Sequence, residues 1–440
     1  MTHTRLFARM LALHGGPLLP RSWSLVHYGV LLASVGWSAW SLFHSRRAAI
    51  AAVATVALSP ACLDLSLSAM QEMPMTAWGM LAVAFALASR HAPHPGYLLA
   101  SGACAVVSLL LKLTGGVFVA ACVLILLAGE GTVSRPTQGH RLRRALGYSA
   151  AVATLCGLGL AIVDGRPLST LLGSHWTSRV RAAGSGGQTL VQTGLGLWAH
   201  AWPVLIAAVL AAWPGARRPP GCGSSLALQA AVLLPVVLFH LLIRPWWGYY
   251  SVSAIAVLAP AAGYAVVRGR EDLRLAWQTG VPSRTFLTAT LRMIVLALAA
   301  GAAGLGWVER IRLWNSAPRV EASPILRAIE AYQADGPAGC MYSADAMDAF
   351  WAGIPVPPEL LVISEKRFLS GSLPEDGVPR VLERSGCDFI VLPEGSAPTR
   401  GETWNALLSR DYVRTTVGAG KELFVHRELD PRPHESHVRW

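Results

Sequence analysis

The sequence predicts a polytopic α-helical membrane protein that ends in a small soluble α/β domain. Of its 440 residues, 53% are hydrophobic and only 14% are charged, whereas a soluble domain usually carries about a quarter charged residues. Residues 1–315 hold 24 Lys and Arg against 7 Asp and Glu, and residues 316–440 hold 13 against 18. Because the basic residues are scattered between apolar stretches, the composition excludes an ordinary soluble protein and a nucleic-acid binder.

Ten apolar stretches are candidates for membrane spans, since a helix needs roughly 20 apolar residues to cross a bilayer core. They lie near 23–43, 48–66, 74–89, 97–111, 114–128, 145–163, 199–213, 225–242, 250–267 and 287–305. The first stretch is not a signal peptide, because no cleavage site of small residues follows it and further apolar stretches do. We therefore expect a transmembrane domain over residues 23–305.

The Lys and Arg residues between these stretches predict the orientation. Thirteen of them lie in alternate loops, which contain Arg46–Arg47, Arg90, Arg135–Arg144, Arg217–Arg218 and Arg268–Arg284. The opposite loops, 67–73, 112–113, 164–198 and 243–249, hold only five. By the positive-inside rule the first set is cytoplasmic. The second set and the tail then face outward, which in a bacterium means the periplasm beyond the inner membrane.

Residues 1–22 do not fit this topology easily. They fall on the outer side, yet they carry Arg5, Arg9 and Arg21 and no export signal. We interpret them as the remnant of a first outward loop whose preceding helix lies upstream of Met1. The alternative, an interfacial segment that is simply translocated, stays open.

The tail, residues 316–440, follows a short linker at 306–315 and has the pattern of a periplasmic α/β domain. Short apolar runs bounded by Gly and Pro predict strands, and apolar residues at helical spacing predict helices between them. The expected helices are Pro324–Gln333 and Pro379–Ser385, and the expected strands are Gly339–Ser343, Asp388–Pro393 and Leu423–His426. The alternation favours a small, partly parallel sheet. Cys340 and Cys387 could pair on this oxidising side if their strands are adjacent; the alternative of two free thiols stays open.

Ionisable side chains near membrane depth are costly, and several occur in the outward loops. Lys112 lies in LLLKLTGG at the end of an apolar stretch, where Thr114–Gly116 should break the helix. It could snorkel to lipid headgroups or bind phosphate oxygens. Glu72 in AMQEMP could orient a substrate, or simply stabilise a helix N-terminus.

Two further segments combine cations with aromatic residues. His175 lies in GSHWTSRVR, which is either an interfacial anchor or a base beside phosphate-pairing arginines. His240 and Arg244 lie four residues apart in HLLIRPWWGYY, which also contains Tyr249 and Tyr250. Interfacial aromatic belts explain the Trp and Tyr residues, but they do not explain the His and the Arg. Since arginine suits phosphate recognition, we favour a functional role for this segment.

These unusual polar groups all lie on the predicted outer side. A transporter would be expected to place them near the midplane, between paired broken helices. The pattern instead favours an enzyme that works on a lipid-linked phosphate substrate, and the alternative is a non-catalytic or transporter-like (flippase-like) polytopic protein.

The order of the motifs resembles the C-type (GT-C) membrane glycosyltransferases, in particular the branch that contains protein O-mannosyltransferases and aminoarabinose transferases. That order is LSP at 58–60, AMQEMP, LLLKLTGG, the SHW loop, HLLIRPWWGYY and an outward α/β tail. The resemblance implies a GT-C-like helical bundle. It also implies a hexosyl or pentosyl transferase that moves a sugar from a polyprenyl-phosphate donor to a lipid, glycan or protein acceptor at the outer face of the inner membrane.

The resemblance also assigns roles to particular residues. Glu72 and His175 are expected to be catalytic. Lys112, His240, Arg244, Tyr249 and Tyr250 are expected to bind the donor phosphate and its carrier lipid. A divalent metal, Mg²⁺ or Mn²⁺, could act near the phosphate; its ligands are not predicted.

The chain departs from the family pattern at one point. The main catalytic acid of the family lies in the first outward loop, but no Asp or Glu precedes Asp64 here. We therefore expect either that this acid lies upstream of Met1 or that this copy is inactive.

Overall fold

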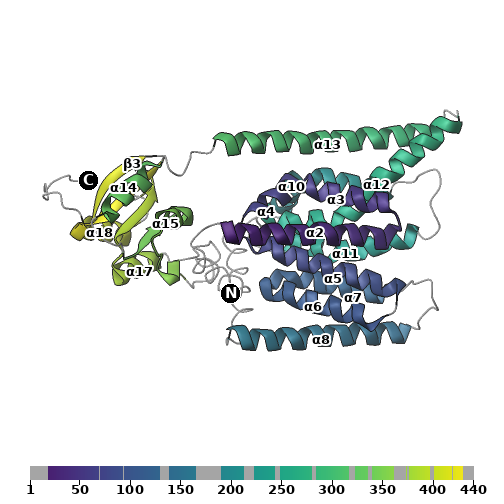
Figure 1. The fold of residues 1–440 in the computed structure, drawn as a ribbon, viewed down its shortest axis with the longest axis horizontal. Coiled ribbons are helices and arrows are strands. Elements are labelled where there is room, and N and C mark those ends of the chain that lie inside the picture. Colours follow the sequence, from purple (N-terminus) through teal and green to yellow (C-terminus); the bar gives the residue numbers. More distant parts are fainter. Residues whose placement is uncertain are drawn as a thin grey trace. The chain divides into compact units, whose positions relative to one another are not determined.

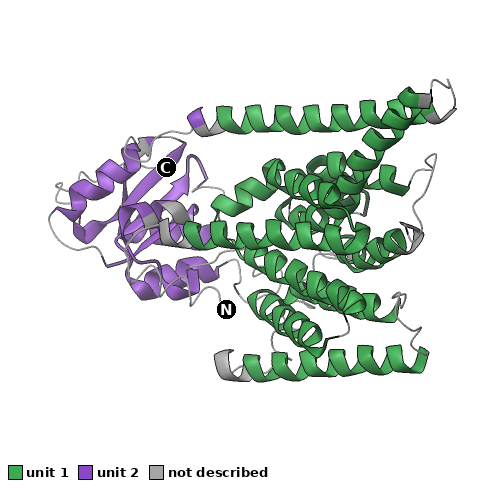
Figure 2. Cartoon of the chain, turned by 45° about the vertical axis from the view of Figure 1, so that its right-hand side comes forward, with its two compact units in different colours: residues 1–173, 182–312 green, residues 174–181, 313–440 purple. Residues whose placement is uncertain are grey.

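The chain forms two compact units, which Figure 2 shows in separate colours. A computed structural model describes residues 18–68, 70–92, 94–128, 138–164, 190–212, 222–242, 248–279, 284–316, 323–334, 339–360, 373, 376–396, 401–418 and 420–429. The first unit holds the described helices up to residue 312, and the second holds the described residues from 313 onward.

The first unit is a bundle of long helices that run roughly side by side (Figure 1). Its α-helices are α2 (Leu18–Phe43), α3 (Arg46–Ala57), α4 (Pro60–Leu67), α5 (Glu72–His91), α6 (Pro95–Leu111), α7 (Gly116–Leu127), α8 (Gln138–Asp164), α10 (Leu190–Ala212), α11 (Cys222–Leu242), α12 (Ser251–Thr279) and α13 (Arg284–Ser316). Two 3₁₀ turns, η1 (Leu113–Gly115) and η2 (Gly248–Tyr250), precede α7 and α12. Within the described residues, each of the ten predicted apolar stretches is helical.

The helices α5 and α12 form the centre of the bundle. Helix α5 packs against α2, α6 and α7, and α12 packs against α2, α3, α10 and α11. Helix α5 and the part of α12 up to Ala265 are apolar and buried on nearly every face, as expected of helices surrounded by other helices. The outer helices α8, α10 and α13 instead expose large apolar residues, among them Leu146, Leu195, Leu287, Leu298 and Leu305.

Those exposed apolar surfaces and the helix lengths describe a multi-pass membrane protein. Four described helices are long and apolar enough to cross a membrane alone: Arg21–Phe43, Val191–Ala212, Gly248–Gln278 and Phe286–Arg312. A bent pair, α3 with α4, counts as a fifth, and three shorter apolar helices cover Pro95–Leu111, Leu113–Leu127 and Ser225–Leu241.

Several predicted boundaries were wrong, and each has a physical reason. The stretch 48–66 is two helices that meet at 64°, because Pro60 begins α4 and cannot continue the hydrogen bonding of α3. The loop expected between Arg268 and Arg284 is helical as far as Thr279, where salt bridges such as Arg268–Asp272 (3.3 Å) support the extension.

Another loop prediction fails in the same way, because hydropathy marks the apolar part of a helix and misses its polar end. Helix α8 begins at Gln138, inside the predicted loop Arg135–Arg144. The predicted linker 306–315 is covered by the last turns of α13, and the boundary between the two units lies within it. Helix α2 begins at Leu18, within the segment 1–22 that was expected to be a loop remnant; residues 1–17 lie outside the described part.

The second unit is a four-stranded sheet with helices on both faces. The strands are β1 (Met341–Ser343), β2 (Phe389–Pro393), β3 (Tyr412–Gly418) and β4 (Lys421–His426), in the order β1-β2-β4-β3. The described helices are α14 (Pro324–Gln333), α15 (Ala346–Ala352), α17 (Gly377–Ser385) and α18 (Glu402–Asp411), with short 3₁₀ turns η4 (Pro358–Leu360) and η6 (Arg427–Leu429). Strands β1 and β2 are parallel and the other pairs antiparallel, so the partly parallel sheet is confirmed.

Alternating side chains of the strands supply two apolar cores. Met341, Phe389 and Val391 pack with α14 and α15 on one face. Tyr342, Ile390 and Leu392 pack with α17 and α18 on the other. Strand β2 is buried on both faces, which explains its unbroken apolar run FIVLP.

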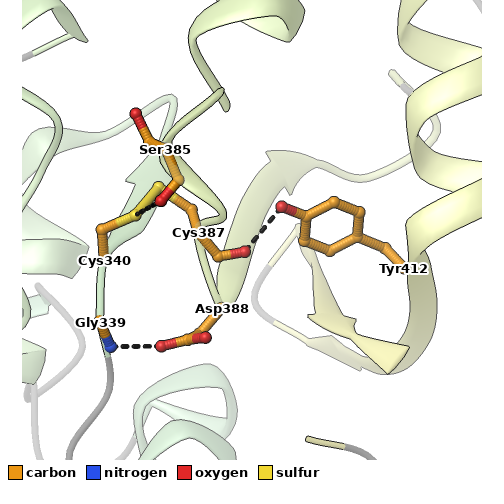
Figure 3. Close-up of a disulfide and its surroundings, with 6 residues drawn as sticks. All are labelled: Gly339, Cys340, Ser385, Cys387, Asp388 and Tyr412. Atoms are coloured by element: carbon orange, nitrogen blue, oxygen red, sulfur yellow. Dashed lines mark hydrogen bonds between the residues drawn. A yellow bond between two sulfur atoms is a disulfide. The ribbon is translucent and has the colours of Figure 1, made fainter. Parts of the chain in front are cut away.

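The pairing of Cys340 with Cys387, left open by the sequence, is present in the structure. Cys340 directly precedes β1, and Cys387 lies two residues before the start of β2. These strands pair with Met341 opposite Phe389, and the two sulfur atoms form a disulfide (Figure 3). The Tyr412 hydroxyl donates a hydrogen bond to the Cys387 carbonyl (2.6 Å), and the Gly339 N–H donates one to the Asp388 carboxylate. The disulfide thus ties together the starts of the two parallel strands, β1 at the edge of the described sheet and β2 next to it.

Candidate functional site

The segment around Lys112 is fixed against its neighbours by hydrogen bonds. Helix α6 ends at Leu111, and Lys112 is extended, with its N–H donating to the Ser108 carbonyl (3.1 Å). The Ser108 hydroxyl in turn donates to the Met75 carbonyl of α5 (2.8 Å). A Cβ atom at Gly115 would lie 2.6 Å from the Ser108 carbonyl oxygen, so the close approach of this turn requires glycine. The predicted helix break is confirmed, and it directs Lys112 toward α5.

The Lys112 ammonium forms a salt bridge with the Glu72 carboxylate. Glu72 is the first residue of α5, where the helix dipole favours a negative charge. The Glu72 side chain is only 5% exposed and that of Lys112 is 21% exposed. The two charged groups come from loops that are separate in the sequence. They therefore neutralise one another in a largely dry environment.

Two aromatic rings complete the surroundings of the ammonium group. The Lys112 Nζ atom lies 5.3 Å from the ring centroid of Tyr249 and 4.9 Å from that of Tyr250. These distances are in the range of cation–π attraction. A Cβ atom at Gly248 would lie 2.6 Å from Nε2 of His200, so the imidazole of α10 packs directly over the backbone that precedes the two tyrosines.

A small pocket adjoins the salt bridge. It is about large enough for a single water molecule. Its lining combines the Glu72 carboxylate with hydroxyl and apolar side chains: Met75, Thr76, Thr114, Val117, Phe239, Tyr249, Tyr250 and Ser253. No pattern in the sequence pointed to Thr76, Ser253 or His200, because each looks like an ordinary residue of an apolar helix or its end, and Thr114 was noted only as part of the expected helix break.

His240 lies beside this pocket but does not line it. Its Nε2 atom is 3.2 Å from the hydroxyl oxygen of Ser253, which does line the pocket, and its ring makes an edge-on contact with Phe239. His240 is fully buried. Its predicted role at the donor phosphate stays a prediction. Arg244 and His175, the other predicted site residues, lie outside the described residues.

The loops expected on the outer side and the loops expected in the cytoplasm lie at opposite ends of the bundle, as the charge pattern predicts. Glu72, Lys112 and Tyr249 come from three loops expected on the outer side, and they meet at one end. At the other end, loops expected in the cytoplasm meet: His91 Nε2 lies 2.9 Å from the Ser41 carbonyl, and the Ser225 hydroxyl donates to the Leu42 carbonyl (2.5 Å).

The residues around Lys112 do not fit a divalent-metal site. Within the described part of the chain, no three His, Cys, Asp or Glu side chains come together as ligands. The nearby carboxylate of Glu72 is already bound to an ammonium group, whose charge would repel a metal ion. The arrangement suits an anion that approaches the cation. A dependence on Mg²⁺ or Mn²⁺ stays a prediction.

No protein-family model and no curated protein matches this sequence. Solved structures of ArnT from Cupriavidus metallidurans do resemble the chain in three dimensions. The structure of the apo state has a TM-score of 0.62 at 15% identity, and the structure bound to undecaprenyl phosphate has a TM-score of 0.57 at 14% identity. Each alignment covers 98% of this chain and 88% of ArnT. The chain therefore has the fold of the GT-C membrane glycosyltransferases, as its motifs implied.

Proposed function

We propose that this protein is a glycosyltransferase that uses a polyprenyl-phosphate-linked sugar donor. The observation that carries the proposal is the Lys112 ammonium, held at one end of a GT-C-type bundle by Glu72, Tyr249 and Tyr250. A cation in a largely dry site is suited to an anionic headgroup at the end of a lipid. Support comes from ArnT, which shares the fold and has been solved with undecaprenyl phosphate bound.

The donor phosphate and Glu72 would compete for the same ammonium group. The Glu72 carboxylate bonds Lys112 directly in this structure. A donor phosphate that takes over Lys112 would release the carboxylate, which could then accept the proton of an acceptor hydroxyl. Arg244, four residues before Gly248, is proposed as a second cation for the phosphate, and His175 stays a candidate base.

The proposed reaction is a displacement at the anomeric carbon of the donor sugar. The acceptor oxygen forms a bond to that carbon while the bond to the phosphate oxygen breaks, so the sugar is transferred with inversion. The electron pair of the broken bond leaves with polyprenyl phosphate, and the acceptor proton goes to Glu72. Because the leaving group is already a stabilised anion, the protein mainly positions the reactants and removes one proton.

The proposed location is the outer face of the inner membrane. Lys112, Glu72 and the tyrosines lie at the end of the bundle with few basic loops. The disulfide of the second unit is typical of an oxidising compartment such as the periplasm. Under the same proposal, the acceptor is a lipid, glycan or protein that is accessible on that side of the membrane.

The test compares three proteins in lipid vesicles: the wild type, Glu72→Gln, and Lys112→Met combined with Glu72→Gln. The double variant removes both charges together and so leaves neither buried alone. We expect Glu72→Gln to bind undecaprenyl phosphate about tenfold more tightly than the wild type, because the competing carboxylate is gone, and the double variant to lose the binding.

Transfer is then measured with a panel of undecaprenyl-phosphate sugars, using bacterial membranes as the source of acceptors. Arg143→Ala, which removes an exposed cation on α8, serves as the control for loss of one positive charge. The proposal fails if the double variant binds undecaprenyl phosphate as well as the wild type, or if the wild type transfers sugar from no donor.

A further inference from the structure

Two threonine hydroxyls in the pocket beside Glu72 have no hydrogen-bond partner among the described residues. They are the Oγ1 atoms of Thr76 and Thr114, and both atoms are inaccessible to solvent. Thr76 lies on α5, one turn after Glu72, and is completely buried. Most buried hydroxyls in folded proteins have a partner. Two residues that line this pocket therefore carry hydroxyls whose hydrogen-bonding capacity is unused among the described residues.

Some buried hydroxyls of the bundle have a partner and others have none among the described residues, the latter including those of Ser24, Ser38, Thr193, Ser251 and Thr290. Three examples show the paired kind. The Thr55 hydroxyl donates to the Ala51 carbonyl of its own helix (2.8 Å). The Ser101 hydroxyl donates to the Ala82 carbonyl (2.9 Å), and that of Ser108 donates to the Met75 carbonyl (2.8 Å). Thr76 and Thr114 differ from the other residues with unpaired hydroxyls because both line one pocket.

The size and lining of the pocket restrict what it can hold. It has room for about one water-sized group. Glu72, Thr76 and Thr114 provide polar contacts, whereas Met75, Val117 and Phe239 provide apolar walls. Such a pocket accepts one small polar substituent that can donate to a carboxylate and exchange hydrogen bonds with hydroxyls, and it excludes a whole sugar ring.

We propose that this pocket is a subsite that recognises a single hydroxyl group of a substrate, through Thr76 and Thr114, next to the cation that binds the phosphate. This inference rests on the proposed function. The hydroxyl belongs either to the donor sugar or to the acceptor, since both are hydroxyl-bearing. A site with buried polar groups discriminates strongly against an analogue that cannot pair with them. The two threonines would therefore determine specificity.

The inference predicts opposite changes in stability and activity. Thr76→Val keeps the shape of the side chain and removes the unused hydroxyl, so the variant should have a higher Tm than the wild type. The same variant should lose transfer activity about 10- to 100-fold in kcat/KM, because the substrate hydroxyl loses its partner. If Thr76 were merely structural, its replacement by valine would lower the Tm and change the kinetics little when equal amounts of folded protein are compared.

The experiment measures Tm and transfer kinetics for the full-length protein in vesicles, with the undecaprenyl-phosphate sugar that the wild type uses best. The variants are Thr76→Val, Thr114→Val and Thr76→Ser, which retains a hydroxyl and should restore most of the activity. Thr55→Val is the matched control, because its hydroxyl already has a partner and lies outside the pocket. Binding of undecaprenyl phosphate itself, which has no sugar, should stay unchanged in every variant.

The kinetics also identify the source of the hydroxyl. If the variants raise the KM for the donor sugar and also change donor hydrolysis in the absence of acceptor, the recognised hydroxyl belongs to the donor. If they raise only the KM for acceptor membranes, the hydroxyl belongs to the acceptor. Wild-type kinetics in both valine variants would overturn the subsite, and so would a lowered Tm in Thr76→Val. A wild type that transfers from no donor would instead refute the proposed function.

Discussion

Lys112 and Lys421 are two lysines of one chain in very different surroundings. In the helical bundle, Lys112 meets one carboxylate, Glu72, and two aromatic rings. In the α/β unit, Lys421 lies at the start of β4 and bonds both oxygens of Asp348 (2.8 Å each) and one of Asp345 (3.2 Å). Asp348 also accepts a hydrogen bond from the Ser343 hydroxyl (2.7 Å).

The difference shows how to separate a binding cation from a structural one. Around Lys421, two carboxylates outnumber the cation, so an incoming anion would be repelled. Among the described residues around Lys112, one carboxylate balances the cation and the aromatic rings carry no charge, so a phosphate can replace Glu72 without leaving a second acid unpaired. The carboxylates also differ in exposure, since the Asp345 side chain is 53% exposed and that of Glu72 only 5%. In the Lys112 pair, an incoming phosphate can therefore take the place of the Glu72 carboxylate. The Lys421 cluster instead holds strands β1 and β4 to α15.

The largest effect on stability should come from breaking the Lys112 pair on one side only. Lys112→Met leaves the Glu72 carboxylate buried without its cation, and removing one partner of a buried pair costs roughly 3–5 kcal/mol. Adding Glu72→Gln should recover most of that loss. Thermal unfolding in matched lipid vesicles measures both steps. Equal stability of the single and the double variant would show that water reaches Glu72 and that the pair is not dry.

The disulfide of the second unit should have the next largest effect. Replacing Cys340 and Cys387 by Ser removes a crosslink between residues 47 apart, and loss of such a bond costs about 2–4 kcal/mol. We expect the α/β unit to be proteolysed faster while the unfolding of the bundle stays unchanged. Gel analysis of the full-length protein during digestion measures the proteolysis. Reduction of the wild type should reproduce the result. Unchanged proteolysis would show that the sheet alone holds β1 against β2.

The apolar stretches and the strand pattern were enough to predict the helices of the first unit, two helices of the second unit and three of its described strands. Strand β3 was missed although the β-branched residues in Tyr412–Gly418 are typical of a strand, and helices α15 and α18 were missed as well. Helix ends were less predictable, because salt bridges such as Arg268–Asp272 extend a helix beyond its apolar part. The pairing of Cys340 with Cys387 required the order of the strands, which local patterns do not contain.

Four residues that meet in the candidate site, Glu72, Lys112, Tyr249 and Tyr250, could be selected from the sequence one by one, but their assembly could not be predicted. Glu72 and Lys112 each stood out as a costly ion near membrane depth, yet forty residues separate them and only the packing of α5 against α6 brings them together. Thr76 and Thr114 were not recognised, since a threonine in an apolar helix usually bonds a carbonyl of its own helix. Only the structure reveals that these two hydroxyls do not.

A smaller effect, on the binding of undecaprenyl phosphate, should follow from a substitution at Gly248, next to the two tyrosines. Gly248→Ala places a methyl group where Nε2 of His200 now lies, 2.6 Å from the new atom, so either the imidazole or the turn η2 must move. A shift of Tyr249 and Tyr250 away from Lys112 would weaken cation–π attraction and should lower the affinity for undecaprenyl phosphate about tenfold, or roughly 1.4 kcal/mol. Gly248→Ala combined with His200→Ala should recover the affinity. No change in the single variant would show that His200 turns aside freely.

The smallest effect should come from Lys421, and its pH dependence has a definite sign. Burial lowers the pKa of Lys421, but the hydrogen bonds and charges of Asp348 and Asp345 outweigh it, so the net pKa is raised. A raised pKa means that the cluster stabilises the folded unit fully below the unfolded lysine pKa of about 10.4 and loses this contribution as the pH rises through the folded value. Because the cluster is partly exposed, Lys421→Met should cost about 1 kcal/mol or less at neutral pH. Pulse proteolysis in urea between pH 8 and pH 11 should show the wild type and the variant converging at the alkaline end. A difference that stays constant over this range would mean that Lys421 acts through the packing of its alkyl chain, and the contrast with Lys112 would then rest on geometry alone.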